Sequence, residues 1–183
     1  REEVKVKSVP YKGMVDDGIA YVRLTRFTRN CASEVEEAIV ELTDENEVKG
    51  LVLDLRGNPG GLLNESVSLC NLFIDKNQEV VSTKGKIKDW EKSYKTTKEP
   101  LYKELPLAVL INQSSASASE IVSGTIQDLD RGVVLGKKSF GKGLVQQTRK
   151  LSYNSQLKVT VAKYYTPSGR CIQALDYTNK NED

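Results

Sequence analysis

Hydrophobic and polar positions follow one another along this chain in a way that predicts an α/β fold. The apolar runs at 51–55 and 107–111 have the length and composition of buried strands. Each run is followed by a turn rich in small and polar residues, and then by a segment whose apolar residues recur three and four positions apart, which is typical of an amphipathic helix. This repetition of strand, turn and helix predicts βαβ units around a largely parallel sheet.

The remaining elements follow from the same two periodicities. Apolar residues at helical spacing predict helices, and Asn30 stands where it can cap the first of them. Alternating or short apolar runs that are bounded by glycine, proline and aspartate predict strands. The helices are expected over 32–42, 62–73 and 117–129, and the additional strands over 3–9, 19–24 and 132–135.

The last third of the chain changes from this repetition to β structure. Residues 144–151 and 156–165 alternate as strands, and a protruding hairpin is expected from 80–83 to the segment around Trp90 and Tyr94. We therefore expect one core with an additional C-terminal β region. The expected organisation is the end of an upstream domain or a linker at 1–10, the core at 11–177 and a disordered tail at 178–183.

The composition is that of a soluble globular domain. Of the 183 residues, 38% are hydrophobic and 28% are charged, and the net charge is +2. The basic residues are scattered, which argues against a nucleic-acid-binding surface, and no apolar run is long enough to span a bilayer. Because the chain begins at Arg1 and not at a methionine, we expect one domain of a longer protein, with any targeting segment upstream.

The cysteines argue against a metal site. Cys31, Cys70 and Cys171 are odd in number and far apart, and the chain contains no histidine that would complete a zinc site. Cys70 falls in an apolar helical pattern, so we expect it in the core.

The lack of histidine also restricts the chemistry of a serine nucleophile. A serine hydroxyl needs a neighbouring base to take its proton, and without imidazole the candidates are a carboxylate or a neutral amine. Ser117 follows the buried run 107–111 and a polar turn, at the point where a helix begins. The unpaired N–H groups of that helix would face the same place and would stabilise an oxyanion there.

Lys142 is the candidate base. It stands between two glycines, which permit close approach of another part of the backbone. Gln146 can orient the amine through its carbonyl oxygen without adding negative charge. A lysine acts as a base only when its amine is neutral, and this requires burial, so we expect Phe140 and Leu144 to form an apolar wall around it.

Both segments have simpler interpretations. Ser117 and Glu120 form the pattern of a capping box, which needs no chemistry. Residues 136–143 nearly match a phosphate-binding loop, but Gly143 replaces the required hydroxyl, and a strand pattern follows where that loop needs a helix. The S-x-x-K pattern at 139–142 is found in penicillin-binding proteins, but their companion motifs are absent.

Four blocks of the chain together resemble the carboxyl-terminal processing proteases, which are S41 serine peptidases related to the tricorn core. The blocks are DLRGNPGG at 54–61, NQSSASASEI at 112–121, GKKSFGKGLVQ at 136–146 and YYTPSGR at 164–170. Cys171 departs from the pattern, because relatives often have serine there. The resemblance implies a ClpP/crotonase-like α/β core of βαβ units with an additional C-terminal β region, which agrees with the hydrophobic pattern.

The resemblance assigns roles to the residues that the chemistry selects. It implies that Ser117 is the nucleophile, that Lys142 is its base and that Gln146 orients the lysine. The backbone N–H groups of Ala118 and Gly60 would form the oxyanion hole. The small residues expected to line the substrate-binding cleft are Gly61, Ser115 and Ala116.

The implied activity is that of a serine endopeptidase that cleaves unfolded or tail-exposed polypeptides through an acyl-enzyme, with no metal or organic cofactor. The implied partners are polypeptide substrates and an upstream PDZ domain of the parent chain, and a homo-oligomer is compatible with the resemblance. The implied location is the bacterial cell envelope, either periplasmic or secreted. The alternative is a non-catalytic module of the same fold that binds peptides, or apolar ligands as interphotoreceptor retinoid-binding proteins do.

The alternating segment 157–163 suggests how a substrate is held. Strands beside a peptidase nucleophile can pair with an extended substrate through the backbone, which recognises a peptide without requiring one sequence. Selectivity would then come from apolar pockets near Ser117, and we expect a small or apolar residue before the scissile bond.

Overall fold

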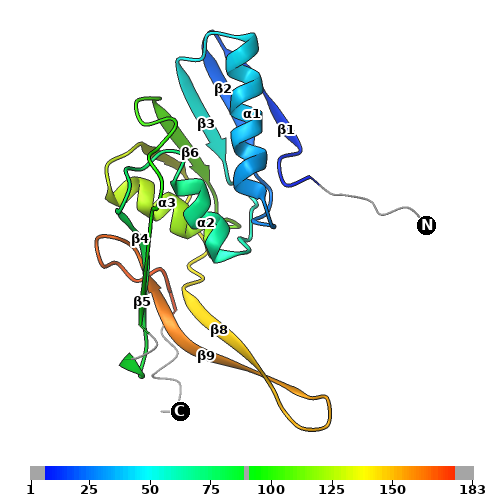
Figure 1. The fold of residues 1–183 in the computed structure, drawn as a ribbon, viewed down its shortest axis with the longest axis vertical. Coiled ribbons are helices and arrows are strands. Elements are labelled where there is room, and N and C mark those ends of the chain that lie inside the picture. The colour runs from blue at the N-terminus through cyan, green and yellow to red at the C-terminus, as the bar shows by residue number, and fades with distance from the viewer. Residues whose placement is uncertain (1–6, 89–90, 176–183) are drawn as a thin grey trace, which may run out of the picture.

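The computed structural model describes residues 7–88 and 91–175, in which two β-sheets and three α-helices are found (Figure 1). One sheet has the strand order β1-β2-β3-β6-β7, and the other has the order β5-β4-β9-β8. The strands are β1 (Tyr11–Asp16), β2 (Ile19–Arg23), β3 (Gly50–Asp54), β4 (Glu79–Lys84), β5 (Lys92–Lys95), β6 (Leu107–Ile111), β7 (Val133–Gly136), β8 (Leu144–Lys150) and β9 (Gln156–Tyr165). The helices are α1 (Cys31–Glu45), α2 (Leu63–Cys70) and α3 (Ala118–Asp128).

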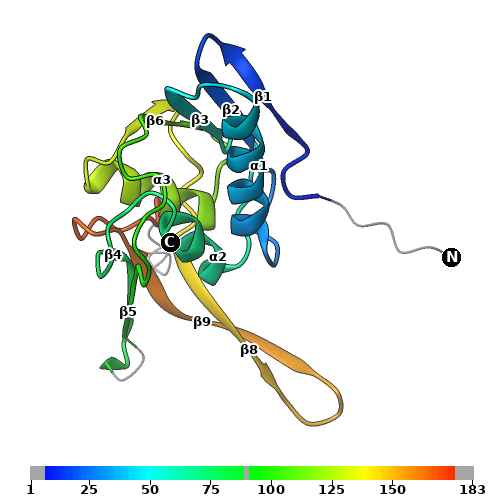
Figure 2. The same ribbon diagram turned by 45° about the horizontal axis from the view of Figure 1, so that its top comes forward.

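The five-stranded sheet forms the core of the protein. Strands β2, β3, β6 and β7 are parallel, and β1 joins β2 as an antiparallel hairpin. Helix α1 contacts β1 and β2, α3 contacts β7, and α2 packs on both α1 and α3 (Figure 2). Leu53 and Val109, on the central strands β3 and β6, are fully buried. Because β3 and β6 are parallel neighbours, the loops that follow them start at the same edge of the sheet.

The second sheet is built around a long hairpin of β8 and β9, the β8–β9 arm (144–165), which projects away from the core (Figures 1 and 2). Strands β8 and β9 pair along the arm, whereas β4 pairs with β9 only from Ser82 to Lys84. The hydroxyl of Thr125 in α3 donates to the carbonyl of Val80 in β4 at 2.8 Å, which ties this sheet to the core. The outer arm lacks that support, and every residue from 146 to 160 is exposed.

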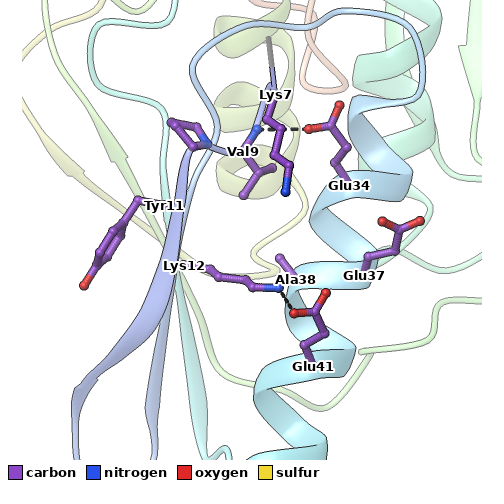
Figure 3. Close-up of a pocket in the computed structure, with 9 residues that line it drawn as sticks. Lys7, Val9, Tyr11, Lys12, Glu34, Glu37, Ala38 and Glu41 are labelled. Carbon is purple, nitrogen blue, oxygen red and sulfur yellow. Dashed lines mark hydrogen bonds and ion pairs between the residues drawn. The ribbon is translucent and has the colours of Figure 1, made fainter. Parts of the chain in front are cut away.

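The segment before β1 is anchored on α1 (Figure 3). The backbone N–H groups of Ser8 and Val9 donate to Oε2 of Glu34 at 2.8 and 3.2 Å, and Lys12 forms an ion pair with Glu41. A groove of about 370 Å³ lies between this segment and the helix. Lysines and glutamates face one another across it, so its charges are largely balanced.

The predicted strand over 3–9 is wrong in its described part. Residues 3–6 lie outside the described residues, and 7–9 form no strand. The first strand of the described residues is β1, whose sequence alternates too weakly to be recognised alone. It forms because Asp17 and Gly18 make a tight turn that returns the chain along β1, with Gly18 in the left-handed conformation at φ 76°.

The other predicted elements are present with their ends shifted by a few residues, and the α/β class is confirmed. Asn30 occupies the N-cap position of α1 as predicted, but its side chain makes no capping hydrogen bond. Glu65 of α2 accepts the N–H groups of Asn30 and Ala32 instead. Trp90 and the tail predicted at 178–183 lie outside the described residues. Within the described ranges, no helix is both long and apolar enough to cross a membrane.

Candidate active site

Ser117 occupies the sharp turn between β6 and α3. Its backbone has φ 56° and ψ −112°, a conformation that is rare for a residue with a side chain and costs about 1–3 kcal/mol. A helix N-cap ordinarily has an extended backbone, so capping alone does not account for this strain. A strained turn from strand to helix exposes a serine nucleophile at the end of a sheet strand, and Ser117 is only half-buried.

The capping box predicted at the start of α3 is present, and its glutamate also contacts the predicted base. The N–H of Ser117 donates to Oε2 of Glu120 at 2.8 Å. The same oxygen accepts the N–H of Lys142 at 2.8 Å, and Oε1 accepts the N–H of Gly141 at 2.6 Å. Glu120 as a whole is 5% exposed. Glu120 therefore caps the helix. It also links the backbones of the two predicted catalytic residues, because one of its oxygens accepts the N–H groups of both.

The side chain of the predicted base is not covered as expected. Lys142 is exposed, Phe140 is 63% exposed and Leu144 is half-buried, so the expected apolar wall is wrong for this conformation. The loop of Lys142 leads directly into the projecting arm, and Gln173 and Ala174 bond the backbone of its two glycines while the lysine side chain stays exposed. Gln146 lies exposed in β8, and across the described residues the side chains of Ser117, Lys142 and Gln146 form no hydrogen bond with one another.

The glycine-rich loop after β3 packs directly on Ser117. Gly60 has φ +93°, and a Cβ there would lie 2.9 Å from Cβ of Ser117 and 2.8 Å from N of Ala118, so only glycine fits. In the described chain the N–H of Ala118 has no hydrogen-bond partner, as an oxyanion donor requires. The N–H of Gly60 instead donates to Oδ1 of Asn58 at 2.8 Å. The two predicted donors are therefore brought together, but one of them is occupied in this conformation.

Asn58 is fully buried and connects the segments around the site. Its Nδ2 donates to the carbonyl of Leu24 at 2.9 Å, and its Oδ1 accepts from Gly60. Its carbonyl accepts the N–H of Ala116 at 3.0 Å and the hydroxyl of Ser119 at 2.9 Å. Asn58 thus holds the segment after β2, the glycine loop and the residues on both sides of the nucleophile in one network.

Two of the residues expected to line the substrate cleft lie inside the protein. Ser115 is fully buried, and its hydroxyl donates to the carbonyl of Leu55 at 2.8 Å. Ala116 is 5% exposed. Their side chains shape the turn before Ser117, so in this conformation they are not available to a substrate. Gly61 packs on Phe27, where a Cβ would lie 2.2 Å from the carbonyl oxygen of that residue.

An ion pair between a buried carboxylate and an exposed arginine fixes the start of the glycine loop. Asp54 is 2% exposed and accepts hydrogen bonds from Nε and Nη2 of Arg56 at 2.9 and 2.8 Å and from the hydroxyl of Tyr21 at 2.5 Å. Burial by itself would raise the pKa of Asp54, but these hydrogen bonds outweigh burial and hold the pKa below its ordinary value. Burial, together with the bond to Asp54, raises the pKa of Tyr21. The side chains of Asp54 and Arg56 therefore stay charged, and their ion pair orients the loop.

Sequence reasoning missed two contributions to this site. It treated Asn58 as part of a glycine turn, although an asparagine two residues before a glycine is a signal for a side chain that bonds the backbone of its own loop. It treated Glu120 as a cap and had no signal for the contact with Lys142. The structure also removes the phosphate-loop interpretation of 136–143, because the strand β8 and not a helix follows it.

Comparisons with known proteins identify one family of peptidases. The family described as "Peptidase family S41" matches residues 18–179. A carboxy-terminal-processing protease of Bartonella bacilliformis is 43% identical over 181 residues, which are 97% of this chain and 41% of that protein. A probable CtpA-like serine protease of Staphylococcus haemolyticus is 42% identical over 94% of this chain and 34% of its own length. The chain thus spans less than half the length of these relatives.

Solved structures give the same result. The photosystem II D1 C-terminal processing protease superposes with a TM-score of 0.78 and 35% identity, over 93% of this chain and 43% of that chain. The tricorn protease shares the fold, with a TM-score of 0.52 and 15% identity over 83% of this chain and 13% of its own. The match over most of the chain and the identity to these relatives show that the chain belongs to peptidase family S41.

Proposed function

We propose that this chain is the catalytic core of a serine endopeptidase in which Ser117 is the nucleophile and Lys142 is the base. The observation that carries the proposal is the buried carboxylate of Glu120, which accepts the backbone N–H groups of both residues at 2.8 Å. The strained backbone of Ser117 and membership of a peptidase family support the same assignment.

In the proposed reaction, the neutral amine of Lys142 takes the proton of the Ser117 hydroxyl as its oxygen attacks the peptide carbonyl. The N–H of Ala118 stabilises the oxyanion, and the N–H of Gly60 joins it when it leaves Asn58. Lys142 then gives the proton to the departing amine. Water, deprotonated by the same lysine, releases the second product from the acyl-enzyme, while Gln146 orients the lysine.

The exposed position of Lys142 suggests that the substrate completes the site. A polypeptide that lies over the loop would remove water from the amine and favour its neutral form. By likeness to the carboxy-terminal-processing proteases, we extend this proposal to tail-exposed or unfolded polypeptides as substrates. The same likeness extends it to an upstream PDZ domain and a place in the bacterial cell envelope.

The test compares Ser117→Ala and Lys142→Ala with Lys138→Ala, an exposed lysine of the same loop, in hydrolysis of a denatured protein. General-base catalysis contributes about 10²–10⁴-fold, so both site variants should lose at least that much while the control retains its rate. A fluorophosphonate probe should label Ser117. Turnover by folded Lys142→Ala, with an unchanged circular dichroism spectrum, contradicts the base. A Ser117 that no probe labels favours a non-catalytic binding module.

A further inference from the structure

A groove beside the proposed base combines an apolar floor with basic side chains. It has a volume of about 690 Å³ and lies between the end of β4 and the β8–β9 arm. Leu144, which lines it, follows Lys142 by two residues, so one end of the groove lies next to the proposed catalytic loop. Its apolar side chains include Ile87, Leu144 and Val159, and its basic side chains are Lys84, Lys86 and Lys163.

The charged side chains among the described residues that line this groove are all basic. None of the described residues that line it carries a carboxylate, and the sequence contains no aspartate or glutamate from 131 to 175. The groove on α1 differs, because Glu34, Glu37 and Glu41 lie among its lysines (Figure 3). At the basic groove, Nζ of Lys84 lies 5.1 Å from the ring centre of Tyr165, which holds this charge at the rim. Lys84 and Lys86 therefore place positive charge along an apolar surface.

The arm also offers an open backbone edge along the groove. Strand β4 pairs with β9 only as far as Lys163, and Gly85 approaches the carbonyl of Val161 closely. Within the described chain, residues 156–160 have no strand partner on this side. An open edge of this kind accepts an extended peptide as an additional strand. The apolar side chains Ile87 and Val159 are 46% and 38% exposed beside it.

We propose that this groove binds an extended part of the polypeptide substrate that carries acidic side chains among apolar ones. The proposal rests on the proposed function, because the bound segment belongs to the polypeptide that is cleaved at Ser117. Carboxylates of the segment would pair with Lys84 and Lys86 while its apolar side chains cover the floor. Exposed ion pairs are weak singly, but several along one segment combine into a clear preference.

The test measures binding apart from cleavage by using the Ser117→Ala protein. Two fluorescent peptides of equal length and equal apolar content, one with several glutamates and one with lysines in their place, are compared by anisotropy. We expect the acidic peptide to bind at least about tenfold more tightly and to lose most of this advantage at about 0.5 M salt. Lys84→Glu/Lys86→Glu should abolish the preference. Lys49→Glu/Lys76→Glu, which changes the net charge equally outside the groove, should leave it intact.

Several results would overturn the proposal. One is equal binding of the two peptides. Another is an unchanged preference for the acidic peptide in Lys84→Glu/Lys86→Glu that has a native circular dichroism spectrum. A third is an equal loss of that preference in Lys49→Glu/Lys76→Glu. Tighter binding of phosphatidylglycerol vesicles than of the acidic peptide would assign the surface to a membrane instead. Failure of the groove proposal can be told apart from failure of the peptidase assignment. A protein that cleaves its substrate but shows no preference for the acidic peptide contradicts only the groove proposal. If the unmodified protein prefers the acidic peptide but cleaves no substrate, the result contradicts the peptidase assignment and not the binding of acidic peptides by the groove.

Discussion

Replacing Glu120 with glutamine tests whether one carboxylate holds the nucleophile and the base in register. Glutamine has nearly the same size, but it accepts only through Oε1, while its Nε2 is a donor. In the structure one oxygen of Glu120 serves Gly141 and the other serves both Ser117 and Lys142. The single acceptor oxygen of glutamine can therefore serve either Gly141 alone or both Ser117 and Lys142. In each case its NH₂ group faces the N–H groups that are left without an acceptor.

The structure sets the size of the effect. Even the better orientation leaves the partly buried N–H of Gly141 without an acceptor, at a cost of about 1–3 kcal/mol, and it turns charged hydrogen bonds into weaker neutral ones. Loss of the charge relieves part of the desolvation, so we expect the free energy of unfolding to fall by about 2–4 kcal/mol. A displacement of the Lys142 loop by about 1 Å would lower kcat by about 10²-fold, with a smaller change in KM.

The assay combines urea unfolding, followed by circular dichroism, with kcat and KM for a denatured protein substrate. Glu65→Gln is the matched control, because Glu65 also accepts two backbone N–H groups but does so at the start of α1. It should lower stability without lowering kcat in folded protein. The reasoning is refuted if Glu120→Gln keeps the original kcat, or if both variants lose kcat equally.

Two further predictions concern ionisation. The folded pKa of Asp54 lies below its unfolded value of about 4, so Asp54 stabilises the fold above that pH, and the contribution is lost as pH falls through the folded pKa. The Tm of Asp54→Asn should therefore fall less steeply with acid, and parallel Tm–pH curves would contradict this. Burial raises the pKa of Cys70 to about 12 and also raises that of Cys31, whereas Cys171 is exposed. A thiol reagent at neutral pH should modify Cys171 quickly and the other two only on unfolding, and rapid reaction of all three in the folded protein would be evidence against the buried positions.

The sequence by itself determined the order of the elements and the residues that carry the chemistry. A strand buried on both faces is apolar at nearly every position, so 51–55, in which Asp54 is the one polar residue, and 107–111 were recognisable without a structure. The missing histidine and the four blocks directed attention to Ser117 and Lys142 for chemical reasons that do not depend on their surroundings. The capping box was predictable because Ser117 and Glu120, the two residues that form it, lie within one turn of helix.

Only the tertiary structure decided how these residues are held and how far they are covered. Glu120 reaches Lys142 across 22 positions, and the Asn58 side chain reaches Leu24 across 34, and no local periodicity reports hydrogen bonds between such distant segments. The exposure of Lys142 likewise depends on the direction in which the β8–β9 arm leaves the core, and not on the apolar character of its neighbours. The hydrophobic pattern indicates which side of an element is buried. The hydrogen-bond partners and the burial of a polar side chain are decided only when separate elements pack together.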